Sequence, residues 1–244
     1  VSFPESAEYE CNVGHTITGM IGAAIRMQVE CQSDGQYAPV PPCMPVVCGR
    51  PPNVPHTTYA NRTIVYPNNV TYTCSEGYSL NARADGTRQF SVACQPNGFT
   101  SPSSCRKVEC GECPHDAVLH ATAPSGSGIR VYGDECTYSC EPGYTLNQDA
   151  SGPRTLNTTC LANGTFSDSA SCMPVSCGPP AVIDHANLTD SSLERGVVYP
   201  GVARYQCRQG YTLTGSAGAP AQFEQRCQMD GQYSAAEECK PVTC

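Results

Sequence analysis

The sequence predicts an all-β protein built from small disulfide-stapled modules that follow one another in an elongated rod. Of its 244 residues 18 are cysteine, and Asx-Gly pairs typical of hairpin turns recur along the chain. No stretch has the apolar period of an amphipathic helix. Short alternating segments separated by turns at regular intervals are typical of β modules.

Sixteen cysteines form one repeating ladder. The third follows the second by 20 residues, the fourth comes 11 or 12 residues later, and the next unit opens 5 residues further on. The opening positions are Cys48, Cys110, Cys177 and Cys244, the second Cys11, Cys74, Cys140 and Cys207, the third Cys31, Cys94, Cys160 and Cys227, and the fourth Cys43, Cys105, Cys172 and Cys239. Cys113 and Cys136 stand outside the ladder.

Other residue types keep the same register. Side chains alternate along a strand, so a tyrosine two residues before the second cysteine shares its face. These tyrosines are Tyr9, Tyr72, Tyr138 and Tyr205, and the glycines three residues after the cysteine are Gly14, Gly77, Gly143 and Gly210. On the third cysteine's face we expect Met27, Phe90, Leu156 and Phe223. Hairpin turns are predicted at Asp34-Gly35, Asn97-Gly98, Asn163-Gly164 and Asp230-Gly231.

A unit of about 60 residues is marginally stable on hydrophobic burial alone, so it needs disulfides. Four cysteines allow three connectivities, and spacing alone leaves the choice between them open.

Several motifs together carry a family resemblance. Units open with Cys48-Gly49-Arg50-Pro51-Pro52 and Cys177-Gly178-Pro179-Pro180, and Tyr66-Pro67, Tyr132-Gly133 and Tyr199-Pro200 precede the second cysteine. The pattern Tyr-x-Cys-x-x-Gly-Tyr-x-Leu follows, and then Gly and an aromatic residue before the last cysteine. Each unit resembles the complement control protein module, also called the sushi domain or short consensus repeat. Where that family usually carries Trp, this chain has Tyr37, Phe99, Phe166 and Tyr233, which favours a lineage distant from vertebrate complement proteins.

The resemblance implies that the first cysteine pairs with the third and the second with the fourth. The implied bonds are Cys11–Cys43, Cys48–Cys94, Cys74–Cys105, Cys110–Cys160, Cys140–Cys172, Cys177–Cys227 and Cys207–Cys239. Cys113 and Cys136 are left as an extra pair, and Cys31 and Cys244 have no expected partner in this chain.

The ladder also divides the chain into modules. Residues 1–43 are a partial module without its N-terminal part, in which Phe3-Pro4 aligns with Tyr66-Pro67. Modules are predicted at 48–105, at 110–172 with the extra disulfide, and at 177–239, and 240–244 holds a linker and the first cysteine of a further module. We therefore expect the native polypeptide to continue in both directions.

The linkers between modules are four residues long. They are Met44-Pro45-Val46-Val47, Arg106-Lys107-Val108-Glu109, Met173-Pro174-Val175-Ser176 and Lys240-Pro241-Val242-Thr243. Proline makes a short linker stiff, and the recurring valine is expected to pack between neighbouring modules. The linker with Arg106 and Lys107 lacks proline and is the expected hinge.

Composition excludes several functions. The net charge is −8 without a basic stripe, which argues against nucleic-acid binding, and the longest apolar run, Met20 to Ile25, is too short to span a membrane. Catalytic motifs such as HExxH and the P-loop are missing. The CxxC of Cys110 and Cys113 is assigned to disulfides, because a zinc site would leave the ladder unpaired. We expect no cofactor, no metal and no catalysis.

The recurring histidines are interpreted as a structural or surface feature of the module. The five histidines of the chain are His15, His56, His115, His120 and His185. His56 and His185 each follow an opening cysteine by 8 residues and His120 follows by 10, a recurrence typical of a module's own architecture. The pairs His115-Asp116 and Asp184-His185 could in principle supply a base with an orienting carboxylate, but neighbours on a strand point to opposite faces, so we predict no such role.

Five sequons predict N-glycosylation, at Asn61, Asn69, Asn157, Asn163 and Asn187. The resemblance implies an extracellular, non-catalytic protein, secreted or part of a cell-surface ectodomain. Three hypotheses stay open: a structural or adhesive array in a coat, stalk or filament, a ligand-binding array like the complement regulators, and a segment of a larger receptor or protease. The expected partner is an extracellular protein or glycan, or further copies of the chain, and no ligand-binding residue is predicted.

Overall fold

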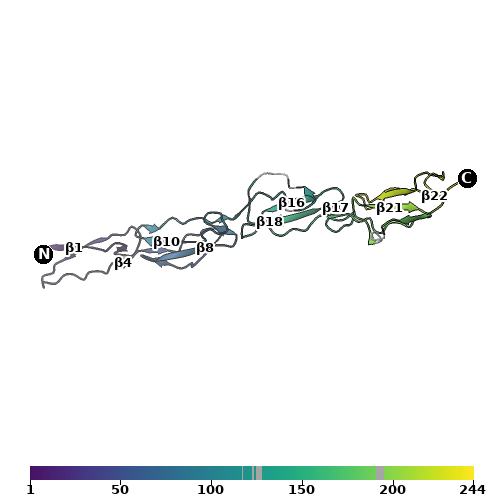
Figure 1. The fold of residues 1–244 in the computed structure, drawn as a ribbon. Helices are drawn as coiled ribbons and strands as arrows, with labels where there is room; N and C mark the ends of the chain where they lie inside the picture. Colours follow the sequence, from purple (N-terminus) through teal and green to yellow (C-terminus); the bar gives the residue numbers. More distant parts are fainter. Residues whose placement is uncertain (117, 123, 125–127, 191–194) are drawn as a thin grey trace. The chain divides into compact units, whose positions relative to one another are not determined.

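The computed structural model describes residues 1–116, 118–122, 124, 128–190 and 195–244. It consists of two compact units, Val1–Cys110 with Leu161–Thr165, and Gly111–Cys160 with Phe166–Cys244. Every regular element named within these ranges is a β-strand, which confirms the all-β class (Figure 1).

The N-terminal part of the first unit has two small sheets. Strands β1 (Ser6–Glu10) and β3 (Arg26–Glu30) pair in antiparallel fashion and place Tyr9 opposite Met27. The short strands β2 (His15–Thr16) and β4 (Met44–Pro45) form the second sheet. Tyr9 is 40% exposed, because residues 1–43 supply no segment to cover it.

The rest of the first unit is a complete module around a four-stranded antiparallel sheet. Its order is β11 (Gly98–Phe99), β10 (Gln89–Gln95), β8 (Asn69–Cys74) and β6 (Thr57–Tyr59). Two short pairs flank it, β5 (Val47–Gly49) with β7 (Ile64–Val65) and β9 (Tyr78–Ser79) with β12 (Arg106–Lys107).

The core of this module follows the predicted two-residue alternation. Val70, Tyr72 and Cys74 of β8 face inward, and the Tyr72 ring lies parallel to the Phe90 ring of β10 at a centroid distance of 4.9 Å. The buried Tyr72 hydroxyl donates a hydrogen bond of 2.7 Å to the carbonyl oxygen of Pro52. A large aromatic side chain is thereby buried without an unsatisfied polar atom.

The second unit contains two modules with three-stranded sheets. In the third module the order is β14 (Ala121–Thr122), β16 (Glu135–Cys140) and β18 (Thr155–Thr159), and β17 (Tyr144–Thr145) pairs with β19 (Met173–Pro174). Strands β13 (Glu109–Gly111) and β15 (Arg130–Val131) lie at its start. In the fourth the order is β20 (Ala186–Leu188), β21 (Val202–Cys207) and β23 (Gln222–Arg226), and β22 (Tyr211–Thr212) pairs with β24 (Lys240–Pro241).

Both modules of this unit repeat the tyrosine core. The hydroxyl of Tyr138 donates to the carbonyl of Pro114 at 2.9 Å, and that of Tyr205 donates to the carbonyl of Ala181 at 2.8 Å. Tyr205 stacks on Phe223 with centroids 5.0 Å apart. The recurring tyrosine is therefore the centre of each complete module.

Candidate functional site: module joints and a groove on the fourth module

The structure places most of the predicted cysteines in disulfide bonds. The bonds are Cys11–Cys43, Cys48–Cys94, Cys74–Cys105, Cys113–Cys136, Cys140–Cys172, Cys177–Cys227 and Cys207–Cys239. Cys110 and Cys160 are each disulfide-bonded as well. Cys31 and Cys244 are free thiols. Each bond is worth about 2–4 kcal/mol in modules that have little core of their own.

The first linker is fixed by a backbone and ring contact within the first unit. Val46 is buried, its N–H donates to the carbonyl of Gly14 at 2.9 Å, and its own carbonyl accepts from the N–H of Tyr66 at 2.8 Å. The Tyr66 ring lies over Gly14, with its edge toward the ring of His15 at a centroid distance of 6.2 Å. The linker valine therefore joins the two modules by one hydrogen bond on each side.

The joint within the second unit repeats the same bonds. The N–H of Val175 donates to the carbonyl of Gly143 at 2.9 Å, and the N–H of Tyr199 donates to the carbonyl of Val175 at 2.8 Å. The Tyr199 ring covers Gly143 and meets Tyr144 edge-on at 6.0 Å. Val175 is fully buried. The valine was predicted to pack between neighbouring modules, and at both joints it is buried and bonded to a glycine and a tyrosine. The joint is therefore a recurring structural feature of the repeat.

Glycine is required at both joints for two reasons. Gly14 and Gly143 have φ values of 78° and 87°, in the left-handed region that favours glycine. A Cβ atom added to either glycine would collide with the tyrosine ring above it. Gly14, Gly143 and the two tyrosines all stand out in the sequence, but their contact joins residues more than fifty positions apart and was not predicted.

The Asx-Gly turn of the following module completes the joint. In the second unit a Cβ atom added at Gly231 would lie 3.2 Å from the Cβ of Ala150 and 3.5 Å from a methyl of Val175. In the first unit Gly98 takes the same place against Ile21, at 3.8 Å. The hairpin turn thus has a second role, because it rests on the loop of the preceding module.

Three histidines stack on the tyrosine that follows the joint glycine. The ring pairs are His56 with Tyr78 at 4.2 Å, His120 with Tyr144 at 4.1 Å, and His185 with Tyr211 at 4.1 Å, all close to parallel. Each histidine has a positive φ of 57° to 61°. The recurrence is therefore a matter of packing inside the module.

The prediction that Asp184 and His185 are neighbours on a strand is wrong. The two residues lie in a turn, not on a strand, and the His185 backbone is in the left-handed region. The His185 ring is instead engaged by Tyr211. His115 and Asp116 also lie in a turn.

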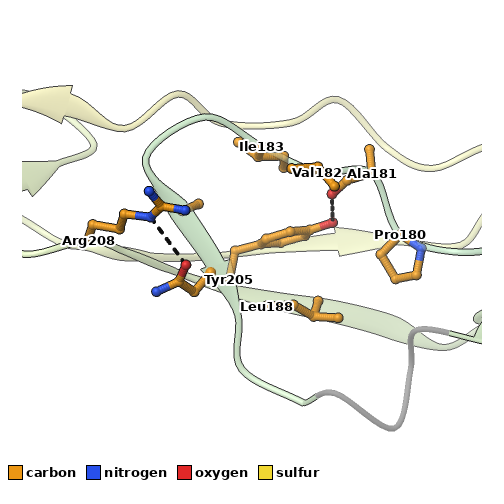
Figure 2. A pocket seen from close by; sticks show the side chains of 9 residues that line it. Pro180, Ala181, Val182, Ile183, Leu188, Tyr205 and Arg208 are labelled. Atoms are coloured by element: carbon orange, nitrogen blue, oxygen red, sulfur yellow. Dashed lines mark hydrogen bonds between the residues drawn. The ribbon is translucent and has the colours of Figure 1, made fainter.

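The fourth module has an open groove of about 400 Å³ that the sequence did not predict (Figure 2). One wall is the irregular segment Pro180 to Ile183, and the other is β20 with Leu188. Figure 2 shows the Tyr205 side chain running between them, with its hydroxyl held by Ala181. At the mouth the Arg208 Nε donates to the Asn187 Oδ1 at 3.3 Å. The groove combines an apolar floor with one cation and one amide.

Burial shifts the pKa of two tyrosine hydroxyls in the fourth module. It raises the pKa of the Tyr205 hydroxyl, and the charge of Tyr233 raises that pKa further. Burial likewise raises the pKa of Tyr233, against a smaller lowering by its hydrogen bond to the Val197 backbone. Both hydroxyls therefore stay protonated donors, and neither is poised as a nucleophile or base.

Tyr205 also lines a second hollow of about 380 Å³. It is lined by Phe223 and a charged pair in which the Arg204 Nε lies 2.9 Å from a carboxylate oxygen of Glu224. Glu224 is also 3.6 Å from Arg226. The two hollows share the Tyr205 side chain and have charged or polar residues in their lining.

All five sequon asparagines are exposed. The side-chain oxygen of Asn163 accepts hydrogen bonds from the N–H and hydroxyl of Thr165, at 3.1 and 2.8 Å. Asn157 donates to a carboxylate oxygen of Glu135 at 3.0 Å. Whether these side chains carry sugar stays a prediction, and their exposure supports it.

Among the described residues no three His, Cys, Asp or Glu side chains are grouped so that they could hold a metal ion. The part of the chain that the structure describes has no helix long and apolar enough to cross a membrane.

Comparison with known proteins identifies the module. Residues 110–172 and 177–244 match the Sushi repeat (SCR repeat) family. The chain is 30% identical over 216 residues to the sushi, von Willebrand factor type A, EGF and pentraxin domain-containing protein 1 of Rattus norvegicus, covering 87% of this chain and 5% of that protein. It is 28% identical to beta-2-glycoprotein 1 of Pan troglodytes, over 81% of this chain and 53% of the relative. It is 26% identical to the C4b-binding protein alpha chain of Homo sapiens, over 100% of this chain and 40% of the relative.

The fold and its disulfides thus define a tandem array of small all-β modules. The chain belongs to the Sushi repeat family, as the resemblance of its motifs predicted. It spans about one-twentieth of the length of the first relative named above.

Proposed function

We propose that this array is a non-catalytic structural or adhesive element of an extracellular coat, stalk or filament. The observation that carries the proposal is the module joint. Val46 and Val175 make the same two backbone hydrogen bonds, to a glycine before them and a tyrosine after them, in two different units. A linker whose backbone is bonded on both sides resists bending, which is what a load-bearing or spacing element requires.

The chemistry of the chain supports an extracellular setting. Sixteen cysteines are disulfide-bonded, and such bonds persist in oxidising compartments. The exposed sequons fit the same setting. The module boundaries that we propose are those of the cysteine ladder, residues 48–105, 110–172 and 177–239, preceded by the partial module 1–43 and followed by 240–244.

Ligand recognition is the second candidate, and the groove beside Tyr205 is the observation that favours it. One relative is named for binding C4b, and others are complement receptor type 2 and beta-2-glycoprotein 1. A site of this kind would bind an apolar side chain between Val182 and Leu188, with Arg208 at the rim. A segment of a larger receptor or protease is compatible with either role.

Distance distributions across the joint of the second unit test the stiffness on which the proposal depends. Probes at Thr155 and Ala236, both exposed, would be attached through non-cysteine chemistry so that the disulfides stay intact. We expect one narrow distribution, which becomes broad in Tyr199→Ala. A broad distribution in the unaltered chain would contradict the structural role.

Extraction from the source distinguishes the two candidates. A coat or filament component should stay in the insoluble extracellular fraction until reduction or proteolysis releases it. A recognition module should instead bind a soluble partner saturably, and Leu188→Ser in the groove should abolish that binding while the disulfides form normally. Ready solubility together with such binding would favour the second candidate.

A further inference from the structure

Strand β20 lies at the edge of the sheet in the fourth module. Among the described strands the order is β20, β21 and β23, so β20 has a paired neighbour on one side only. The N–H of Arg208 donates to the carbonyl of His185 at 2.7 Å, and the N–H of Thr189 donates to the carbonyl of Arg204 at 2.9 Å. Because bonded and non-bonded pairs alternate in an antiparallel ladder, the N–H and C=O of Leu188 point away from β21, at the free edge.

The irregular segment on the opposite side of the groove is held at two points. The Tyr205 hydroxyl donates to the carbonyl of Ala181 at 2.8 Å, and the N–H of Ala186 donates to the carbonyl of Ile183 at 3.2 Å. Between these points Val182 is 99% exposed and lies at the rim of the groove. The segment is therefore fixed apart from β20, and the free edge of that strand opens into a preformed groove (Figure 2).

The two faces of this edge differ in chemistry. Leu188 lies opposite Tyr205 in the register, so both side chains belong to the face that forms the apolar floor of the groove. Asn187 belongs to the other face, and at the mouth of the groove its Oδ1 accepts from the Nε of Arg208. The side chains of a strand added beside β20 would alternate in the same way. One of them would enter the groove, and the next along the chain would lie beside Arg208.

Arg208 supplies the charge that selects a class of side chain at this position. Among the described residues no carboxylate lies within ion-pair distance of Arg208, whereas Arg204 and Arg226 of the same sheet both contact Glu224. A guanidinium group forms charge-assisted hydrogen bonds with a carboxylate. An acidic side chain is therefore the complement of the groove's mouth.

We propose that the groove binds an extended peptide segment of a partner protein, which adds as a strand to the free edge of β20. The backbone of the segment bonds to the N–H and C=O of Leu188. One apolar side chain of the segment lies against Leu188 and Tyr205, and the acidic side chain next to it in sequence pairs with Arg208. Backbone bonds then supply affinity, and the alternating side chains supply specificity. The groove of about 400 Å³ is at the small end of ligand pockets, so it admits side chains of one segment.

The peptide partner deepens the ligand-recognition role proposed above and rests on it, but the two can fail separately. If Leu188→Ser abolishes binding of a soluble partner while no extended peptide binds, the groove is a recognition site of another kind and strand addition is overturned. The stiffness of the joints is measured within the chain and depends on neither result.

A panel of synthetic peptides tests strand addition directly. Each peptide has seven residues and blocked termini, with leucine, valine or phenylalanine at the centre, glutamate beside it and threonine elsewhere. The full chain is used with its N-linked sugars trimmed, so that a glycan on Asn187 does not crowd the edge. We expect saturable NMR shifts of the Leu188 amide and the Arg208 Nε, and slower hydrogen exchange at the Leu188 amide. Failure of every peptide in the panel to bind would overturn the proposal.

Backbone N-methylation of the peptide identifies the mode of binding. In an added strand every second residue directs its N–H toward β20, and the residues between direct theirs to solvent. We therefore expect methylation at alternate positions to weaken binding about tenfold, the equivalent of 1.4 kcal/mol, and methylation at the other positions to have little effect. An even response along the peptide would show binding by side chains alone and overturn strand addition.

Substitution of Arg208 tests the acidic side chain of the partner. Arg208→Gln retains an N–H donor for Asn187 but removes the charge, so we expect the glutamate peptide to lose about tenfold in affinity, whereas a peptide with threonine in place of glutamate is unaffected. Arg226→Gln is the matched control, because it removes a charge of the same sheet outside the groove and should alter neither peptide. An equal loss in the two arginine variants, or equally large NMR shifts with acetate alone, would show unspecific anion binding and overturn the proposal.

Discussion

Replacement of the joint glycine in the second unit gives a quantitative test of how modules are held. Gly143→Ala and Gly210→Ala change the same position of two successive repeats, with φ values of 87° and 85°. The strain of placing alanine in the left-handed region, about 1–2 kcal/mol, is therefore common to both variants. Only Gly143 has a tyrosine ring above it. The difference between the variants reports the joint.

The magnitude follows from the contacts that the new methyl group disturbs. Overpacking against the Tyr199 ring costs about 1–3 kcal/mol. If the ring moves away, the 2.8 Å hydrogen bond from the Tyr199 N–H to the Val175 carbonyl is lost, which costs about 1 kcal/mol more. We expect a difference of about 2 kcal/mol between the two variants, or roughly a 30-fold change in the local opening equilibrium.

Amide hydrogen exchange is the suitable assay, because a chain of several modules does not unfold in one two-state transition. In Gly143→Ala the amides of Val175 and Tyr199 should exchange roughly 30-fold faster than in Gly210→Ala, at a protein concentration where the chain is monomeric. Amides in the centre of β21 serve as an internal reference and should change little. Equal exchange at Val175 in the two variants would refute the role assigned to the tyrosine and glycine contact.

Three further predictions concern disulfides, pH and glycosylation. Replacing Cys113 and Cys136 with serine removes a bond that closes 23 residues, which should destabilise the third module by about 3 kcal/mol in denaturant titrations, and no change would contradict a stabilising role. Burial raises the pKa of Tyr72 and Tyr205 above the usual 10.0, so the unfolded chain ionises first. The stability that these two hydroxyls contribute should therefore be constant below pH 10.0 and fall as pH rises through the folded values, whereas a flat alkaline profile of unfolding would refute this. Deglycosylation should lower the mass of the secreted chain, and peptide mass spectrometry should find sugar on Asn163, whose nitrogen is left available by the hydrogen bonds of its oxygen.

The interior of each module could be predicted from sequence because it depends on a two-residue period. Tyr72 and Phe90 each lie at an even distance from a cysteine on their own strand, so their common face followed from strand geometry. The hydrogen bond from the Tyr72 hydroxyl to Pro52 could not be predicted in the same way. It depends on where an irregular segment passes, and no period describes that path.

The groove and the module joints were harder to predict, because they too depend on segments whose path no sequence period describes. The groove beside Tyr205 exists because residues 180–183 run apart from β20 without pairing to it, and no local pattern marks that gap. The contact of Tyr66 with Gly14 carries a clearer signal, since both residue types recur in fixed positions. Recurrence alone does not show that this tyrosine contacts this glycine, because the two residues belong to different modules.

The strand pairing of the linkers does not depend on the proline from which their stiffness was predicted. Pro45 pairs with His15, Pro174 with Tyr144, and in the linker without proline Lys107 pairs with Tyr78 in the same register. The strand pairing, and not the restricted φ of proline, is therefore common to all these linkers.

Val108, in the linker without proline, makes the same contact with the preceding module inside the first unit. It is 2% exposed, and its N–H donates to the carbonyl of Gly77 at 2.8 Å, as the other linker valines do to their glycines. The N–H of Glu109 adds a second bond, to the carbonyl of Ala82 at 2.8 Å. Lysine in place of proline thus leaves the linker backbone bonded to the preceding module, and proline is only one of the residues that this strand accepts.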